Sequence, residues 1–117
     1  MRCLIVDDSR HFLEAARGLL RRQGVTVVGT AMSAAEAGEL VADLRPDVVL
    51  VDIDLGGESG FDLIMQLRSA GSPPPMILIS THAEQDYADL IAASPAIGFV
   101  PKTNLSAAAI QRLLDRG

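Results

Sequence analysis

The stretch VDIDLGGESG, residues 51–60, decides how the rest of the chain is interpreted. It closes an apolar run, Val48–Val51, with a carboxylate at Asp52, and a second carboxylate follows at Asp54. A run of Val and Leu that does not alternate with polar residues is typical of a strand buried on both faces, as in a parallel sheet. The acids and the glycines after them therefore either cap the next helix or form a chemical site.

Strand-like and helix-like patterns alternate along the whole chain. The other apolar runs lie at Cys3–Val6, Val25–Gly29, Met76–Ile79 and Ile97–Val100. Helical patterns follow the runs at Ser9–Arg22, Ser33–Leu44, Ser59–Ser69, Glu84–Ala93 and Asn104–Asp115. Ser33 with Glu36 is a capping-box signature, and Asn104 is a cap-like residue before the last helix. This alternation predicts one α/β domain over residues 1–117, a doubly wound five-stranded parallel sheet with helices on both faces.

Composition narrows the class of protein. The chain has 117 residues, 49% of them hydrophobic, which fits one compact domain with a real core. Its one cysteine, Cys3, excludes an internal disulfide and suggests a buried, inert thiol in a reducing, cytoplasmic setting. We expect no membrane span and no signal peptide, because no apolar run approaches the roughly 18 residues a span needs. The net charge of −5 argues against direct nucleic-acid binding by this domain.

Polar residues follow four of the five predicted strands. In open parallel sheets, ligands bind beyond the carboxyl ends of the strands, so these side chains should meet at one edge. Any one of them has an ordinary explanation as a helix cap, a turn residue or a solvated side chain. An accidental match at four strand ends is much harder to accept. The residues are Asp7 and Asp8 after the first strand, Asp52 after the third, Ser80, Thr81 and His82 after the fourth, and Lys102 after the fifth.

The chemistry of this set points to a magnesium ion and a phosphoryl group. Three carboxylates at one edge repel one another, and a hard cation such as Mg²⁺ resolves the repulsion. Lys102 supplies a point charge for a phosphoryl oxygen, and the Ser80 hydroxyl can donate to the same group. A carboxylate can itself accept phosphate, and Asp52 at the strand tip is the natural nucleophile. Gly56 and Gly57 would let the backbone approach the ion without a side-chain clash.

These segments resemble a known family. LIVDDS at 4–9, VLVDIDLGGESG at 49–60, LIST at 78–81 and GFVPKT at 98–103 are similar to the receiver domains of bacterial two-component response regulators. The resemblance covers essentially the whole chain. It implies a flavodoxin-like or CheY-like fold with strand order 2-1-3-4-5.

The resemblance also implies a division of roles within the site. Asp52 would be the phosphoacceptor, phosphorylated through Mg²⁺ by a sensor histidine kinase or a phosphotransfer protein. Asp8 would bind the metal directly together with Asp52, Asp7 would act through water, and the backbone carbonyl of Asp54 would complete the protein ligands. Family members often have proline where this chain has Gly56, which suggests a more mobile loop.

The remaining site residues would bind the phosphoryl group or respond to it. Ser80 and Lys102 would contact it, and Ser80 would be drawn inward as Phe99 repacks. This switch would alter the surface of the fourth helix, the fifth strand and the fifth helix, where an output domain, an output protein or a second copy would bind. Asp54, Thr81 and His82 occupy positions that tune dephosphorylation.

Two alternatives stay open at this point. Asp52-Ile53-Asp54 also resembles the DxD motif of haloacid-dehalogenase-type phosphatases, which would make the chain an enzyme rather than a phosphoacceptor. In those enzymes the motif normally follows the first strand, whereas here it follows the third. The other alternative is a pseudo-receiver, a binding module that uses the fold without phosphate.

Overall fold

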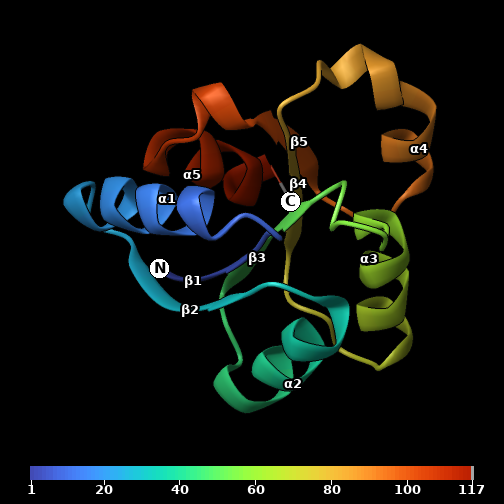
Figure 1. Ribbon diagram of the computed structural model, residues 1–117, viewed down its shortest axis with the longest axis horizontal. Coiled ribbons are helices and arrows are strands. Elements are labelled where there is room, and N and C mark those ends of the chain that lie inside the picture. Colours follow the sequence, from blue (N-terminus) through green and yellow to red (C-terminus); the bar gives the residue numbers. More distant parts are fainter. Residues whose placement is uncertain (117) are drawn as a thin grey trace.

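A single parallel sheet forms the centre of the molecule, and helices cover both of its faces (Figure 1). The computed structural model describes residues 1–116. The sheet has strand order β2-β1-β3-β4-β5, and every neighbouring pair is parallel. The predicted fold class and strand order are therefore confirmed. The strands are β1 (Arg2–Val6), β2 (Thr26–Ala31), β3 (Val48–Asp52), β4 (Met76–Ser80) and β5 (Gly98–Pro101).

The helices alternate with the strands. Between β4 and α4 the chain makes a 3₁₀ turn, η1 (Glu84–Tyr87), and a second one, η2 (Lys102–Asn104), follows β5 directly. The α-helices are α1 (Arg10–Arg22), α2 (Ala34–Leu44), α3 (Gly60–Ser69), α4 (Ala88–Ala93) and α5 (Ala107–Arg116).

The two faces of the sheet bury separate apolar clusters. Successive side chains of a strand point to opposite faces, so one strand contributes side chains to both clusters. On β1, Ile5 packs with α1 and α5, while Leu4 packs in the other cluster with α2 and α3. In Figure 1, α1 and α5 accordingly lie together on one side of the sheet, and α3 lies on the other. This explains why the strands are apolar without alternation.

Three predicted element boundaries were wrong. The second strand runs over Thr26–Ala31 rather than Val25–Gly29, because edge strand β2 follows β1 to its end, where Val6 pairs with Ala31. The fourth helix was expected from Glu84, but its first turn is 3₁₀. Asn104 is not a cap: it belongs to η2, and the hydroxyl of Ser106 accepts the Ala109 N–H at the start of α5.

The capping box at α2 is present in a shifted form. Ser33 Oγ accepts the Glu36 N–H at 3.2 Å, as predicted. Glu36 Oε1 accepts from the N–H of Met32 at 2.7 Å, one residue before the cap itself. Both bonds satisfy backbone donors at the start of the helix.

Cys3 is fully buried in the core, as expected. Burial raises the pKa of its thiol to about 12, which keeps it protonated and unreactive near neutral pH. None of the helices within residues 1–116 has the length and hydropathy of a membrane span.

Gly60 brings α3 into direct contact with the end of β3. Its N–H donates to the Ile53 carbonyl at 2.8 Å. A Cβ atom at this position would lie 2.0 Å from the Asp52 carbonyl oxygen and 3.0 Å from the Ile53 Cα atom, both backbone atoms that cannot move aside. The absence of a side chain at Gly60 therefore helps to place Asp52.

We expect Gly60→Ala to lower the free energy of unfolding by about 2 kcal/mol or more, because the methyl group must displace α3 from β3. Gly38→Ala is the matched control. Gly38 lies inside α2 with open space beside it, so the same change should stabilise the domain by about 0.5–1 kcal/mol. Urea denaturation measures both values. Equal effects of the two substitutions would contradict this account of Gly60.

Candidate functional site

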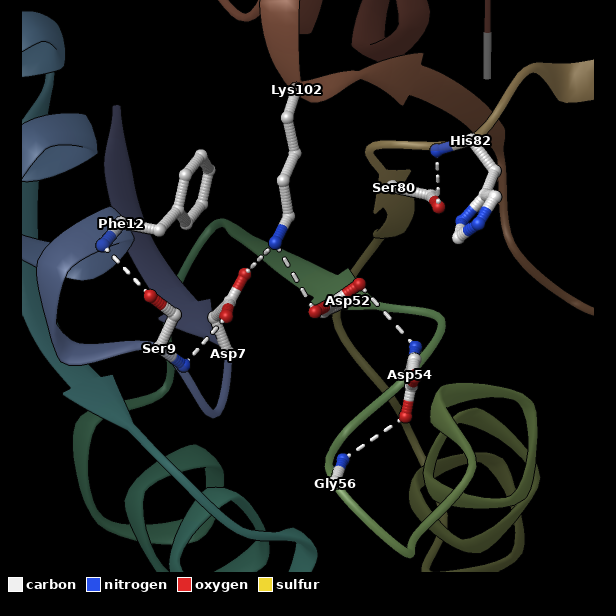
Figure 2. A network of polar contacts seen from close by, with 9 residues as sticks. All are labelled: Asp7, Ser9, Phe12, Asp52, Asp54, Gly56, Ser80, His82 and Lys102. Atoms are coloured by element: carbon white, nitrogen blue, oxygen red, sulfur yellow. Dashed lines mark hydrogen bonds and ion pairs between the residues drawn. The ribbon is translucent and has the colours of Figure 1, made fainter.

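The carboxyl ends of three strands meet around the ammonium group of Lys102 (Figure 2). Asp7 directly follows β1, Asp52 ends β3, and Lys102 follows β5. The Lys102 Nζ atom lies 2.5 Å from Asp7 Oδ2 and 3.2 Å from Asp52 Oδ2. The predicted convergence of these side chains is confirmed.

The carboxylates of Asp7, Asp8 and Asp52 form one cluster, with an oxygen atom from each within 4.8 Å of the others. Asp7 is fully buried and Asp52 is 6% exposed, whereas Asp8 faces solvent. Within residues 1–116, Asp7 Oδ2 accepts no well-directed hydrogen bond, although its distance to Lys102 is that of an ion pair. This oxygen therefore has accepting capacity to spare.

Burial has the largest effect on the charge of Asp52. Desolvation and then the charge of Asp7 raise the pKa of Asp52 from 3.8 to about 6, against the attraction of Lys102. Burial by itself would lower the pKa of Lys102, but its close contacts and charge interactions with the carboxylates of Asp7 and Asp52 outweigh this effect, and the pKa is raised. Lys102 is thus cationic at neutral pH, and Asp52 is a carboxylate whose charge needs a further cation.

The loop after Asp52 folds back on itself. Asp52 Oδ1 accepts the Asp54 N–H at 3.3 Å, and Asp54 Oδ1 accepts the Gly56 N–H at 3.1 Å. Gly56 has φ +62°, and a Cβ on it would lie 2.7 Å from Asp8 Oδ2, so the backbone comes close to a carboxylate of the cluster there, and its approach to an ion stays a prediction. Gly57 differs: the space beside it is open, and what requires glycine is its φ of +94°.

Glu58 links this loop to another element, a contact the sequence analysis missed. Its Oε1 atom accepts the Ala34 N–H at 3.0 Å, and its carbonyl accepts the Leu55 N–H at 2.9 Å. The side chain thus caps α2 while the backbone closes the loop. Glu58 lies 24 residues after Ala34, the first residue of the helix it caps, so no local capping pattern could indicate it.

Ser80 lies at the end of β4 and is 3% exposed. Its hydroxyl oxygen accepts the His82 N–H at 3.0 Å (Figure 2). Thr81 and His82 are exposed on the loop that follows. The His82 ring packs edge-on against the Tyr87 ring, with centroids 6.0 Å apart. The centroid of the Tyr87 ring in turn lies 6.3 Å from that of the Phe61 ring. Tyr87 was not singled out from the sequence.

Phe99 lies in β5 and is 8% exposed. It belongs to the apolar cluster on the α2–α3 face, where Tyr87 and Ile91 also pack. This is a packed position next to α4. Its role as a switch residue stays a prediction.

Phe12 is the second contact that the sequence analysis missed. The Lys102 Nζ atom lies 4.3 Å from the centroid of the Phe12 ring, a cation–π distance. In the sequence, Phe12 is one of several apolar residues with helical spacing, and that pattern predicts only core packing. Only the approach of α1 to the segment after β5 distinguishes it.

Comparison with known proteins identifies the family. Residues 3–114 match the model of the response regulator receiver domain. The chain belongs to this family. A receiver domain takes part in two-component signalling, and the haloacid-dehalogenase alternative has no support from this match.

The curated relatives of this receiver domain are longer proteins. The protein-glutamate methylesterase/protein-glutamine glutaminase 5 of Myxococcus xanthus (strain DK1622) is 33% identical over 119 residues, which cover 100% of this chain and 34% of that protein. The DNA-binding transcriptional activator EvgA of Escherichia coli (strain K12) is 28% identical over 102 residues, 87% of this chain and 50% of that protein. The chain thus spans about a third to a half of the length of these relatives.

Solved structures agree with this assignment. The signal receiver domain of the putative response regulator NarL from Mycobacterium tuberculosis is 31% identical, with a TM-score of 0.83 over 97% of this chain and 95% of that one. A two-component response regulator of the LuxR family from Aurantimonas sp. SI85-9A1 is 28% identical, with a TM-score of 0.86 over 98% of this chain and 85% of that one.

Receiver domains generally bind Mg²⁺ at an acidic pocket, and the residues of this chain fit such an ion. Clustered carboxylate oxygens are the ligands that Mg²⁺ prefers. The buried Asp7 Oδ2 has spare accepting capacity, and Gly56 leaves room beside Asp8. The negative charge of the three acids exceeds the single charge of Lys102, so a further cation would be stabilising.

The raised pKa of Asp52 predicts that the metal-free domain has a lower free energy of unfolding at neutral pH than in acid. A folded-state pKa of about 6 instead of 3.8 means that the folded domain holds this proton more tightly than the unfolded chain. The stabilisation of the folded domain by the protonated Asp52 is fully present below about pH 4 and is lost as the pH rises through about 6. The free energy of unfolding changes by about 2–3 kcal/mol over this range. We expect Asp52→Asn to be more stable than the unsubstituted domain at neutral pH, and the difference to shrink below about pH 4.

Urea denaturation in EDTA at a series of pH values measures this difference. Groups away from the site titrate equally in both proteins and cancel from it. A difference in unfolding free energy that is constant across the series would contradict the assigned burial and repulsion at Asp52.

Proposed function

We propose that this receiver domain accepts a phosphoryl group on Asp52 and signals by its presence. The observation that supports this most is the position of Asp52, at the tip of a central strand beside the Lys102 ammonium and in one cluster with the carboxylates of Asp7 and Asp8. The site combines a nucleophile, a cation and an acidic cluster suited to a metal. Apart from Asp8 these groups are largely buried, which strengthens their interactions.

In the proposed transfer, a carboxylate oxygen of Asp52 attacks the phosphorus of the donor. The bond between phosphorus and the leaving group breaks, its electron pair goes to the leaving group, and Asp52 becomes an acyl phosphate. The donor is a phosphohistidine of a sensor kinase or a phosphotransfer protein, or a small acyl phosphate. The Asp54 N–H, which contacts Asp52 Oδ1, keeps the carboxylate oriented at the strand tip.

Asp8, Asp52 and the backbone carbonyl of Asp54 would hold Mg²⁺, and Asp7 would act through water. When bound, the ion neutralises charge on the carboxylates and on the phosphoryl oxygens. Gly56 supports this assignment, because a side chain there would clash with Asp8 Oδ2, one of the oxygens that would bind the ion.

Lys102 would contact the transferred phosphoryl group, and its ammonium is already beside Asp52. Ser80 would contact the same group after its hydroxyl gives up the contact with the His82 N–H. Rotation of the Ser80 side chain toward the phosphoryl group would break that hydrogen bond and release the His82 N–H, which would link phosphorylation to the segment after β4. Thr81, His82 and Asp54 are exposed around the site, where they would tune the lifetime of the phosphate.

The output of the switch would be the surface formed by α4, β5 and α5. Phe99 of β5 and Ile91 of α4 belong to the same apolar cluster, so a shift of the β4–α4 loop could be transmitted through it. The partner is an attached output domain, a separate protein or a second copy of the domain, and the domain acts in the cytoplasm without binding membrane or nucleic acid itself. Its only catalysis would be its own phosphorylation from acyl phosphates and its own dephosphorylation.

Labelling with acetyl phosphate tests the phosphoacceptor directly. We expect intact-mass spectrometry to show one phosphoryl group per chain in the presence of Mg²⁺ and none in EDTA. Asp52→Asn should abolish labelling, because the amide is not a nucleophile. Asp62→Asn is the matched control: it makes the same chemical change on an exposed side chain of α3, outside the site, and should leave labelling intact.

The same assay separates the proposal from its rivals. Labelling of the Asp52→Asn variant would assign the nucleophile elsewhere. Absence of any labelling, together with absence of Mg²⁺ binding, would indicate a pseudo-receiver. Sustained turnover of a phosphomonoester such as p-nitrophenyl phosphate would indicate a phosphatase.

A further inference from the structure

Lys102 is the single lysine of the chain, since the other basic residues are all arginine. Its side chain lies across the centre of the site and is 12% exposed. A lysine has four flexible carbon atoms, and confining its ammonium to one place costs considerable side-chain entropy. The surroundings of Lys102 must therefore supply contacts that hold it there.

Two of these contacts are the carboxylates of Asp7 and Asp52. The third is the face of the Phe12 ring, 4.3 Å from Nζ to the ring centroid. Figure 2 shows Phe12 and Asp52 on different sides of the ammonium group. The ammonium thus has an aromatic surface on one side and carboxylates on the other.

Phe12 is itself held by the same loop that holds Asp7. Ser9 Oγ accepts the Phe12 N–H at 3.2 Å and begins α1, and Asp7 Oδ1 accepts the Ser9 N–H at 2.8 Å. The contacts run from Asp7 through Ser9 and Phe12 to Lys102 and back to Asp7. Figure 2 marks the hydrogen bonds and the ion pair among them. This closed set of contacts joins the β1–α1 loop to the segment after β5.

We propose that Phe12 is a positioning residue that keeps the Lys102 ammonium beside Asp52 for phosphoryl transfer. The proposal rests on the function proposed above. An aromatic face attracts a cation without accepting a strong directional hydrogen bond. The ring can therefore hold the ammonium near the site and still let it move from Asp7 toward a newly bound phosphoryl oxygen. A third carboxylate in this position would hold Lys102 back, and an aliphatic side chain would not attract it.

The first test observes Lys102 itself and needs no phosphorylation. Because the chain has one lysine, selective ¹³C,¹⁵N-lysine labelling gives a single lysine spin system, which Lys102→Ala assigns by its disappearance. In the metal-free domain, the ring current should move the Lys102 Hε resonances upfield. Phe12→Leu should abolish the shift while keeping an apolar side chain of similar size, and Phe12→Tyr should restore it. An unshifted Lys102 in the unsubstituted domain, or the same shift in Phe12→Leu, would overturn the proposal.

The second test measures the initial rate of labelling by acetyl phosphate at saturating Mg²⁺. Phe12→Leu should slow it by about two- to fivefold, the effect of losing one cation–π contact, and Phe12→Tyr should recover most of the loss. In a Lys102→Ala background, Phe12→Leu should cause no further loss, because Phe12 acts through Lys102. An equal loss in both backgrounds would show that Phe12 acts only on the general structure.

The two tests separate failure of this inference from failure of the proposed function. If the unsubstituted domain takes no phosphoryl group on Asp52, the proposed function fails, and the resonances of Lys102 still decide whether Phe12 holds its ammonium. If Asp52 is labelled and the Leu variant matches the unsubstituted rate, the function stands and the positioning role of Phe12 is excluded.

Discussion

The site depends on an imbalance of charge around one ammonium group. Lys102 lies between two largely buried carboxylates, Asp7 and Asp52, and a third, Asp8, borders them. Burial and mutual repulsion make this arrangement costly, as the raised pKa of Asp52 indicates. The fold tolerates this unfavourable free energy because the strands that position these residues are almost entirely buried in the core. A surface cluster of the same residues would be screened by water and would have little chemical effect.

The rigid and adaptable parts of the site are divided between different segments. The tips of β1 and β3 are fixed by the sheet and by the contact of Gly60 with the Asp52 backbone. The loop that follows contains two positive-φ glycines and is held through hydrogen bonds of Asp54 and Glu58. The segment after β4 is exposed at Thr81 and His82 and is held by the Ser80 hydroxyl and by ring contacts of Tyr87. A signalling domain needs this division, since the nucleophile must stay in place while its surroundings respond.

The residues at the strand ends, and their convergence, were predictable from two simple rules. Buried parallel strands appear as apolar runs, and the carboxyl ends of such strands meet at one edge of the sheet. Asp7, Asp52 and Lys102 follow from these rules. Element boundaries were less predictable, because they depend on pairing and on competition between caps. Asn104 is of a residue type that often caps helices. The chain after β5 first forms a 3₁₀ turn, however, and Ser106 accepts the hydrogen bond at the start of α5 instead.

What the sequence by itself determined is the family, the strand order that the family implies and the residue types at the edge of the sheet, because they follow from local patterns and from chain connectivity. What only the tertiary structure decided is how the segments touch: the Phe12 ring beside Lys102, Glu58 at the start of α2, and Gly56 against Asp8. Each of these contacts joins residues far apart in the chain. Their distances depend on how helices and loops pack onto the sheet, and no local pattern of residues encodes that packing.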